Sequence, residues 1–210
     1  MDTSPSATAK DPAAAPDSAA GPNASDAAGR GGTSTTDNGV QVLGDQTFQA
    51  AAKLAAATPA VGLRLATPAD ADAVTAVFLA SRAAAMPYLP RLHSDEDTAA
   101  WITHVVLPEC RVWVAEQQPG GRIAGFAALT GTELEHLYLH PGALRQGIGT
   151  LLLAAVRQAS PHELTLHVFQ RNTAARAFYE KHGFELVDVN DGSRNEEHEP
   201  DATYRWAPGG

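Results

Sequence analysis

The 210-residue chain has a single cysteine, Cys110, and its acidic side chains outnumber its basic ones. One cysteine excludes an intramolecular disulfide, and we expect a cytoplasmic location. The formal net charge of −9 argues against a general nucleic-acid partner, because such a surface repels phosphate. No apolar run approaches the roughly 20 residues that span a bilayer. The opening MDTSPSATAKDP lacks the basic and apolar regions of a secretory signal, so no such signal is expected, and we expect no membrane partner.

The composition changes near residue 60. Residues 1–60 are rich in Ala, Pro and Ser and contain very few large apolar side chains. Such a segment cannot bury enough area to offset the entropy of ordering it, so we predict a disordered tail there and a folded domain over residues 61–210. Within the tail, residues 48–58 have a helical composition but are too short for a stable isolated helix. The tail is open to interpretation as a linker, an interaction arm or a mis-assigned start.

From residue 61 the hydrophobic pattern alternates between the periods of strands and helices. In chain order it predicts a strand at 62–66, a helix from Thr67, a proline-broken loop at 86–93, a helix from Ser94, a hairpin turning at 119–122, a strand at 132–140, a helix from Gly147, a strand at 163–169, a helix from Asn172 to Gly183, and final strands at 184–190 and 202–207. This order predicts an α/β domain with a mixed sheet. The unit 133–168 is expected to be a right-handed parallel crossover.

Local signals mark the helix ends and their buried faces. Thr67 is followed by Pro68 and, three residues on, by Asp70, which is a strong helix start. Ser94 and Asn172 are the expected N-caps of later helices, and Gly183 is the expected C-terminal residue in left-handed conformation. The predicted buried positions are Val74, Val77, Phe78 and Ser81 in the first helix, Trp101, Ile102, Val105 and Val106 in the second, and Ile148, Leu151, Leu152, Ala155 and Ala159 in the third.

Gly147 and Gly149 stand at the start of an apolar helix, although glycine costs about 1 kcal/mol relative to alanine inside a helix. A strand, a short loop, Gly-x-Gly and a helix together direct unpaired N–H groups outward, which suits a phosphate, and Arg145 adds positive charge. Close packing of the helix on a strand would also explain both glycines. A dinucleotide fingerprint needs a third glycine where Leu152 stands, and a Walker loop needs a Gly-Lys pair that the chain lacks, so neither is favoured.

Three adjoining motifs carry a family resemblance. HPGALRQGIGTLLL (140–153), preceded by ELEHLYL (133–139) and followed by NTAARAFYEKHGF (172–184), resembles the GNAT superfamily of acetyl-CoA-dependent N-acetyltransferases. The resemblance covers about residues 61–207. It implies a GNAT-like mixed, mostly antiparallel sheet of six to seven strands, with a central parallel β-α-β unit and helices on both faces. The family loop reads Arg/Gln-x-x-Gly-x-Gly, and Leu144 stands at its first position here, so phosphate binding by the backbone is implied rather than by that side chain.

The resemblance implies acetyl-CoA as co-substrate and no metal. The N–H groups from Gln146 to Thr150 would hold the CoA diphosphate, and the strand around Leu139 would pair with the pantetheine arm, with the Leu139 N–H polarising the thioester carbonyl. In this family the strands on either side of the helix splay apart and the cofactor sits between them. The implied cofactor-binding residues are Leu137, Tyr138, Leu139, Arg145, Gln146, Gly147, Ile148, Gly149, Thr150 and Asn172.

Asn172 and Tyr179 lie two turns apart on one predicted helix and therefore share a face. In the family the matching Asn hydrogen-bonds the cofactor, and the matching Tyr donates a proton to the departing CoA thiolate. Alternatively, Asn172 is only an N-cap and Tyr179 only a core residue. Capping does not exclude the other role of Asn172.

An amine acceptor is mostly protonated at neutral pH, so a base or a water chain must take its proton. Glu133, Glu135 and His136 are the candidates. Strict alternation places both glutamates on one face of the strand and His136 on the other, unless a bulge intervenes. Glu133 lies fourteen residues before Gly147, where several family members carry a catalytic glutamate. His136 is attractive because an ordinary histidine titrates near neutrality. A charged strand end facing water is the alternative for all three.

The acidic segment 190–201 matches the loop that borders the acceptor site in the family, where it would attract a cationic amine; a solvated hairpin loop is the alternative. Tyr88, His93 and Asp95 are further candidate acceptor contacts. His198 lies among carboxylates but lacks a second ligand cluster, so no metal site is predicted.

No cysteine nucleophile falls in the motifs, so we expect acetyl transfer to a primary amine by direct attack in a ternary complex. A small-molecule acceptor is favoured over a protein N-terminus or lysine. A non-catalytic acyl-CoA-binding regulatory module is the competing reading. The sequence leaves the oligomeric state open, and a homodimer is one option.

Overall fold

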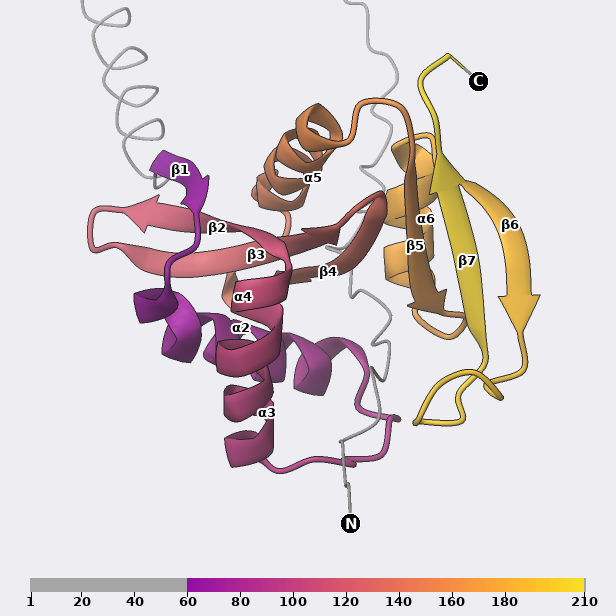
Figure 1. Cartoon of the computed structure of the whole chain (residues 1–210), viewed down its shortest axis with the longest axis horizontal. Coiled ribbons are helices and arrows are strands. Elements are labelled where there is room, and N and C mark those ends of the chain that lie inside the picture. The colour runs from indigo at the N-terminus through magenta and orange to yellow at the C-terminus, as the bar shows by residue number, and fades with distance from the viewer. Residues whose placement is uncertain (1–59, 210) are drawn as a thin grey trace, which may run out of the picture. The chain divides into compact units, whose positions relative to one another are not determined.

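The computed structural model describes residues 60–209 (Figure 1). Apart from Ala60, the tail predicted to be disordered lies outside the described residues. The elements in chain order are β1 (Ala60–Leu65), η1 (Pro68–Asp70), α2 (Ala71–Ala85), α3 (Asp95–Trp101), η2 (Ile102–Val106), α4 (Leu107–Glu109), β2 (Arg111–Gln118), β3 (Arg122–Thr130), β4 (Glu133–Leu139), η3 (Pro141–Ala143), α5 (Ile148–Ala159), β5 (Leu164–Phe169), α6 (Thr173–Lys181), β6 (Glu185–Asn190) and β7 (Asp201–Trp206). No helix among residues 60–209 has both the length and the apolar character that crossing a membrane demands.

The strands form one seven-stranded sheet in the order β1-β2-β3-β4-β5-β7-β6. The pairs β2/β3, β3/β4, β5/β7 and β6/β7 are antiparallel, and β4/β5 is parallel with α5 as the crossover between them. Helix α2 packs against β3 and β4, and α5 packs on the opposite face of the same strands (Figure 1). The predicted mixed sheet, its parallel unit and its helices on both faces are therefore confirmed.

The helix ends follow the predicted local chemistry. The Asp70 carboxylate accepts hydrogen bonds from the N–H and Oγ1 of Thr67, at 2.7 and 2.9 Å. The Oγ of Ser94 accepts from the Asp97 N–H at 3.0 Å. Gly183 has a φ of +74°, the left-handed conformation that ends α6. These contacts join residues close in sequence, which is why the pattern alone predicts them.

The second predicted helix departs from a regular α-helix. Its middle, Ile102–Val106, is a π turn in which the Leu107 N–H donates to the carbonyl of Ile102, five residues back. Pro108 supplies the physical reason, because proline has no N–H to bond the carbonyl four residues earlier and its ring crowds that carbonyl. Trp101, the last residue of α3, leads directly into this wider turn.

One predicted core position of α5 is wrong. Leu151 is 45% exposed, whereas Ile148, Leu152 and Val156 are fully buried. The buried residues of α5 form two adjacent rows of four-residue spacing, one with Ile148, Leu152 and Val156 and one with Gly149 and Leu153, and Leu151 lies outside both. Ala155 and Ala159 pack against the core as expected.

A bulge changes the faces of β4. Leu134 pairs with Leu129 of β3, and His136 pairs with the preceding residue, Ala128, so Glu135 is the extra residue. Strict alternation, which separates Glu133 from His136, is therefore wrong here. Beyond the bulge Leu137 belongs to the core beneath α5 and α6, while Tyr138 belongs to the core beneath α2.

Candidate active site

The parallel strands β4 and β5 meet at one end and then part. Glu133 pairs with Thr165, whose N–H donates to the carbonyl of Thr132 at 2.9 Å. On its other edge β5 pairs with β7 over its whole length, from Leu164 to Phe169. Glu133–Thr165 is the one residue pair between β4 and β5 in the described residues, so the far end of β4 forms its strand pairing there with β3 alone, and the parted strands suit an extended ligand.

The loop before α5 forms a backbone concavity suited to an anion. Gly147 is the N-cap of α5 with a φ of +77°, and it makes no side-chain cap. Two residues earlier, Arg145 also has a positive φ, of 61°. Left-handed residues alternating with right-handed ones turn successive N–H groups toward one side, and the N–H groups of a helix's first turn have no intrahelical partner. An alanine-type Cβ built on Gly147 meets no described residue within 4 Å, so the space beside this residue is not filled by the described part of the chain.

The other residues of this loop divide between packing and exposure. Leu144 packs against the core, and Gly149 is buried, so close helix packing explains this second glycine. Gln146 is exposed, and its amide donates to the carbonyl of Gly142 at 3.1 Å. Thr150 is exposed, and its hydroxyl lies 3.1 Å from Nε2 of His182. Gly147, Gln146 and Thr150 therefore line the outer side of the loop.

Two side chains of α6 and its cap hold buried polar atoms without a partner among the described residues. The Tyr179 hydroxyl is one, and burial raises the pKa of this phenol. Asn172 uses its Oδ1 to cap the Ala175 N–H at 3.1 Å, while its Nδ2 is the second unpartnered atom. Buried polar groups are normally hydrogen-bonded, so both atoms fit a polar ligand between the parted strands. With the parted strands β4 and β5 and the loop at Gly147, these residues fit acetyl-CoA.

The candidate bases occupy different environments on β4. Oε1 of Glu133, whose side chain is 22% exposed, lies 3.5 Å from Nε2 of His167 on β5. Glu135 is half-buried at the bulge. His136 is 4% exposed, and its Nδ1 has no partner among the described residues. Burial, reinforced by the charge of Arg82, lowers the pKa of His136 to about 3.

Aromatic rings enclose His136. The ring centroids of Trp101 and His136 lie 5.2 Å apart, and those of Phe78 and Tyr138 lie 4.9 Å apart. Phe78 and Trp101 also line a cavity of about 780 Å³. One layer of aromatic side chains therefore lies between this cavity and β4.

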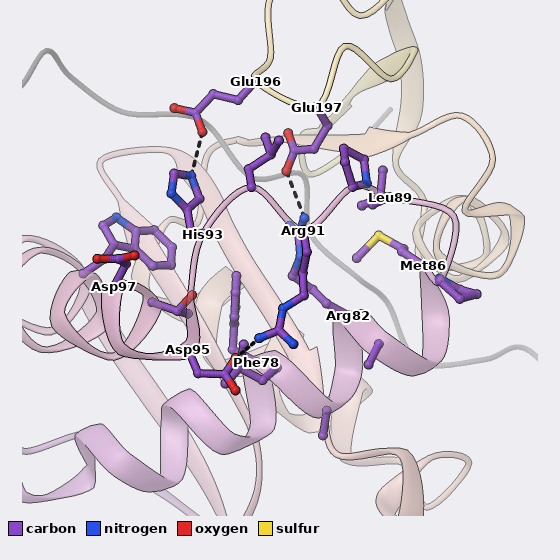
Figure 2. A pocket seen from close by; sticks show the side chains of 18 residues that line it. Phe78, Arg82, Met86, Leu89, Arg91, His93, Asp95, Asp97, Glu196 and Glu197 are labelled. Atoms are coloured by element: carbon purple, nitrogen blue, oxygen red, sulfur yellow. Dashed lines mark hydrogen bonds and ion pairs between the residues drawn. The ribbon is translucent and has the colours of Figure 1, made fainter.

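The cavity lies between the α2–α3 loop and the β6–β7 loop, and Figure 2 shows Glu196 and Glu197 reaching across toward the first loop. An oxygen of Glu197 lies 2.9 Å from a guanidinium nitrogen of Arg82, and Glu196 lies 2.9 Å from Nε2 of His93. Asp95 and Asp97 also line the cavity, as apolar residues such as Met86 and Leu89 do. The cavity is thus a partly apolar site whose rim carries four carboxylates and two guanidinium groups, those of Arg82 and Arg91.

The structure brings together only some of the residues that the sequence suggests as acceptor contacts. His93 and Asp95 line the cavity, whereas Tyr88 packs beneath the guanidinium of Arg171, whose central carbon is 3.9 Å from the ring centroid. Sequence reasoning missed Arg82 and His167. The available signal for His167 is its alternation with Leu166 and Val168, which marks it as the polar side of a strand. Arg82 carries no such signal, because its partner lies 115 residues away.

Comparisons with known proteins agree with this geometry. The family model described as "Acetyltransferase (GNAT) domain" matches residues 108–186. The peptidyl-lysine N-acetyltransferase YiaC of Escherichia coli (strain K12) is 31% identical over 127 residues, which cover 60% of this chain and 84% of that protein. The chain belongs to the GNAT superfamily of N-acetyltransferases. The resemblance and the enzyme class predicted from the sequence are thereby confirmed.

Solved structures show the same fold. Apo YjaB from Escherichia coli matches with a TM-score of 0.59 and 22% identity, over 70% of this chain and 97% of that one. The PaiA N-acetyltransferase from Thermoplasma acidophilum, solved in complex with coenzyme A, matches with a TM-score of 0.54 and 22% identity, over 70% of this chain and 99% of that one.

Proposed function

We propose that the protein transfers an acetyl group from acetyl-CoA to a primary amine by direct attack in a ternary complex, and that a lysine side chain of a peptide is the first acceptor to test. The observation that carries the proposal is the parting of β4 from β5 beside the concavity at Gly147. The Tyr179 hydroxyl, which has no hydrogen-bond partner among the described residues, lies on α6, the helix that follows β5.

Bound acetyl-CoA supplies the acetyl thioester. The N–H groups of Ile148, Gly149 and Thr150 hold its diphosphate, because the first turn of a helix offers unpaired donors and a favourable dipole. The backbone of residues 137–139 aligns the pantetheine arm, and Nδ2 of Asn172 donates to it. The Tyr179 hydroxyl stays protonated because burial raises its pKa, and it is able to donate a proton to the departing thiolate.

Glu133 is the base in this proposal. Its carboxylate is half-buried and lies at the end of β4 where the strands begin to part. His136 is too weak a base to take a proton from an amine at neutral pH, since its pKa is lowered to about 3. Glu135 lies at the bulge, and its replacement by Gln is the matched control for Glu133.

In this proposal the cavity between the α2–α3 and β6–β7 loops collects the acceptor, which reaches β4 past the aromatic side chains of Phe78 and Trp101. Carboxylates at the rim attract a cationic amine and raise its local concentration. The name of the relative YiaC supports a peptidyl lysine. The cavity of about 780 Å³ has the size of a small-molecule site, which keeps a small amine as the second candidate.

Acetyl transfer is tested by incubating the full chain with acetyl-CoA and a panel of lysine peptides, N-terminal peptides and small amines. Release of free CoA thiol and the product mass are followed together. We expect thiol release matched by a gain of one acetyl group on a lysine ε-amine. Tight CoA binding with no thiol release for any amine would instead support the regulatory acyl-CoA-binding module. The cytoplasmic location and the homodimer stay predictions.

A further inference from the structure

His167 lies beside Glu133 on the same face of the sheet. Nε2 of His167 is 3.5 Å from Oε1 of Glu133, and their side chains are 29% and 22% exposed. This separation is longer than a well-formed hydrogen bond of about 2.7–3.2 Å. Catalytic hydrogen bonds are often long in free enzymes and shorten when substrate binds.

The other nitrogen of the imidazole is also engaged. Nδ1 of His167 lies 3.1 Å from Oγ1 of Thr203 on β7, the residue directly opposite in the β5/β7 register. A neutral imidazole has one donor nitrogen and one acceptor nitrogen. If the Thr203 hydroxyl donates to Nδ1, the hydrogen is on Nε2 and points toward the Glu133 carboxylate.

The surroundings of this pair on the sheet are polar. Asp188 of β6 lies opposite Thr203 in the register and forms an ion pair with Arg194 at 2.9 Å. His167 is thus flanked by Glu133 on β4, Thr203 on β7 and, one strand further, Asp188 on β6. Contacts from β4 and β7 thus flank the imidazole, whereas Glu133 stands at the end of its own strand.

We propose that His167 is a positioning residue for acetyl transfer: its Nε2–H fixes one carboxylate oxygen of Glu133, so that the other oxygen faces the incoming amine. The amine proton passes to that second oxygen as the nitrogen–carbonyl bond forms; the carbon–sulfur bond of the thioester then breaks, and the CoA thiolate takes a proton from the Tyr179 hydroxyl. Glu133 later releases its proton to water, and Tyr179 regains one from water. This inference rests on the proposed function and on Glu133 as the base. Thr203 holds the ring in the tautomer that the role requires.

Three variants separate positioning from packing. In His167→Gln the side-chain amide places a donor near the position of Nε2. In His167→Asn the shorter amide reaches only the position of Nδ1, and His167→Leu has no polar atom at either position. We expect kcat to fall about tenfold in His167→Asn and His167→Leu, less than the 10²-fold or more that losing a general base costs. We expect KM for the amine and the acetyl-CoA-induced melting shift to stay unchanged, and His167→Gln to stay within about threefold of the parent kcat.

Coupling to Glu133 is the decisive readout. In a Glu133→Gln background, His167→Asn should cause no further loss of kcat, because residues that act as a unit are not additive. In imidazole ¹⁵N spectra, the hydrogen of His167 should be found on Nε2, and Glu133→Ala should shift the tautomer balance. A tautomer indifferent to Glu133→Ala, or multiplicative losses of kcat, would overturn the inference.

The two proposals fail in different ways. No turnover with any amine overturns acetyl transfer, and the role of His167 falls with it. Normal turnover in the parent that is equal in all three His167 variants overturns the His167 inference and leaves acetyl transfer standing.

Discussion

Glu133 and His136 lie on the same face of β4, because the bulge at Glu135 adds one residue between them. Their surroundings nevertheless differ. The Glu133 carboxylate is half-buried beside an imidazole, whereas His136 is closed in by aromatic rings. A shared face therefore does not give the two candidate bases the same chemistry.

The burial of His136 predicts a dependence of stability on pH. The pKa of its imidazole is about 3 in the folded protein, below the usual value of 6.5, so below pH 6.5 the unfolded state binds the extra proton. The stabilisation is complete above pH 6.5 and is lost as the pH falls toward 3. Between pH 7 and 5 the parent should lose about 2 kcal/mol more unfolding free energy than His136→Leu, measured by urea denaturation. Equal losses in the two proteins would refute this burial effect.

Gly147 and Gly131 provide a matched pair. Both have a positive φ, +77° and +59°, and a Cβ on either meets nothing within 4 Å. Alanine at either position should cost about 1 kcal/mol of stability, from backbone strain alone. Only Gly147→Ala should also weaken acetyl-CoA binding, by about tenfold in calorimetry, because its Cβ enters the space of the diphosphate. Equal acetyl-CoA affinity in the two variants would show that this loop does not bind the diphosphate.

Tyr179 and Tyr204 are both buried, but they differ in the hydrogen bonding of their hydroxyl groups. The Tyr204 hydroxyl donates to Glu180 at 2.6 Å and accepts from Arg176 at 3.0 Å, whereas the Tyr179 hydroxyl has no partner among the described residues. Tyr179→Phe should keep the melting temperature and lower kcat about 100-fold. Tyr204→Phe should cost about 1 kcal/mol of stability and leave kcat unchanged. A Tyr179→Phe enzyme with unaltered kcat across pH 6–9 would exclude the proton-donor role.

The two glutamates at the cavity rim should differ in effect. Glu197 and its partner Arg82 are 9% and 19% exposed, whereas Glu196 and His93 are 45% and 60% exposed. Glu197→Gln removes a carboxylate from the cavity and breaks its ion pair with Arg82, so KM for a cationic amine should rise about tenfold, with a loss of about 1–3 kcal/mol of stability.

The exposed pair supplies the control for this prediction. Glu196→Gln should change stability by less than about 1 kcal/mol, because water screens the pair. Its KM for a cationic amine should rise no more than about twofold. Similar KM values for the two variants would show that Glu197 does not contribute to binding the positive charge of the acceptor.

The order of elements could be predicted from the sequence because its signals are local. The caps at Thr67, Ser94 and Asn172 each bond a residue three positions away. Gly147 needs a backbone conformation that other residues adopt only with strain, so its place in the sequence already marks the loop before α5. The error at Leu151 arose because apolar character alone does not say which side of a helix meets the core.

The sequence by itself determined the alternation of strands and helices, the glycine loop and the family motifs, because each depends on neighbours within a few residues. Only the tertiary structure decided which face Glu133 shares with His136, that His167 stands beside Glu133, and that Arg82 pairs with Glu197, 115 residues further along the chain. These contacts depend on a bulge and on strand register, and they bring together residues whose separation in sequence carries no periodic or local signal.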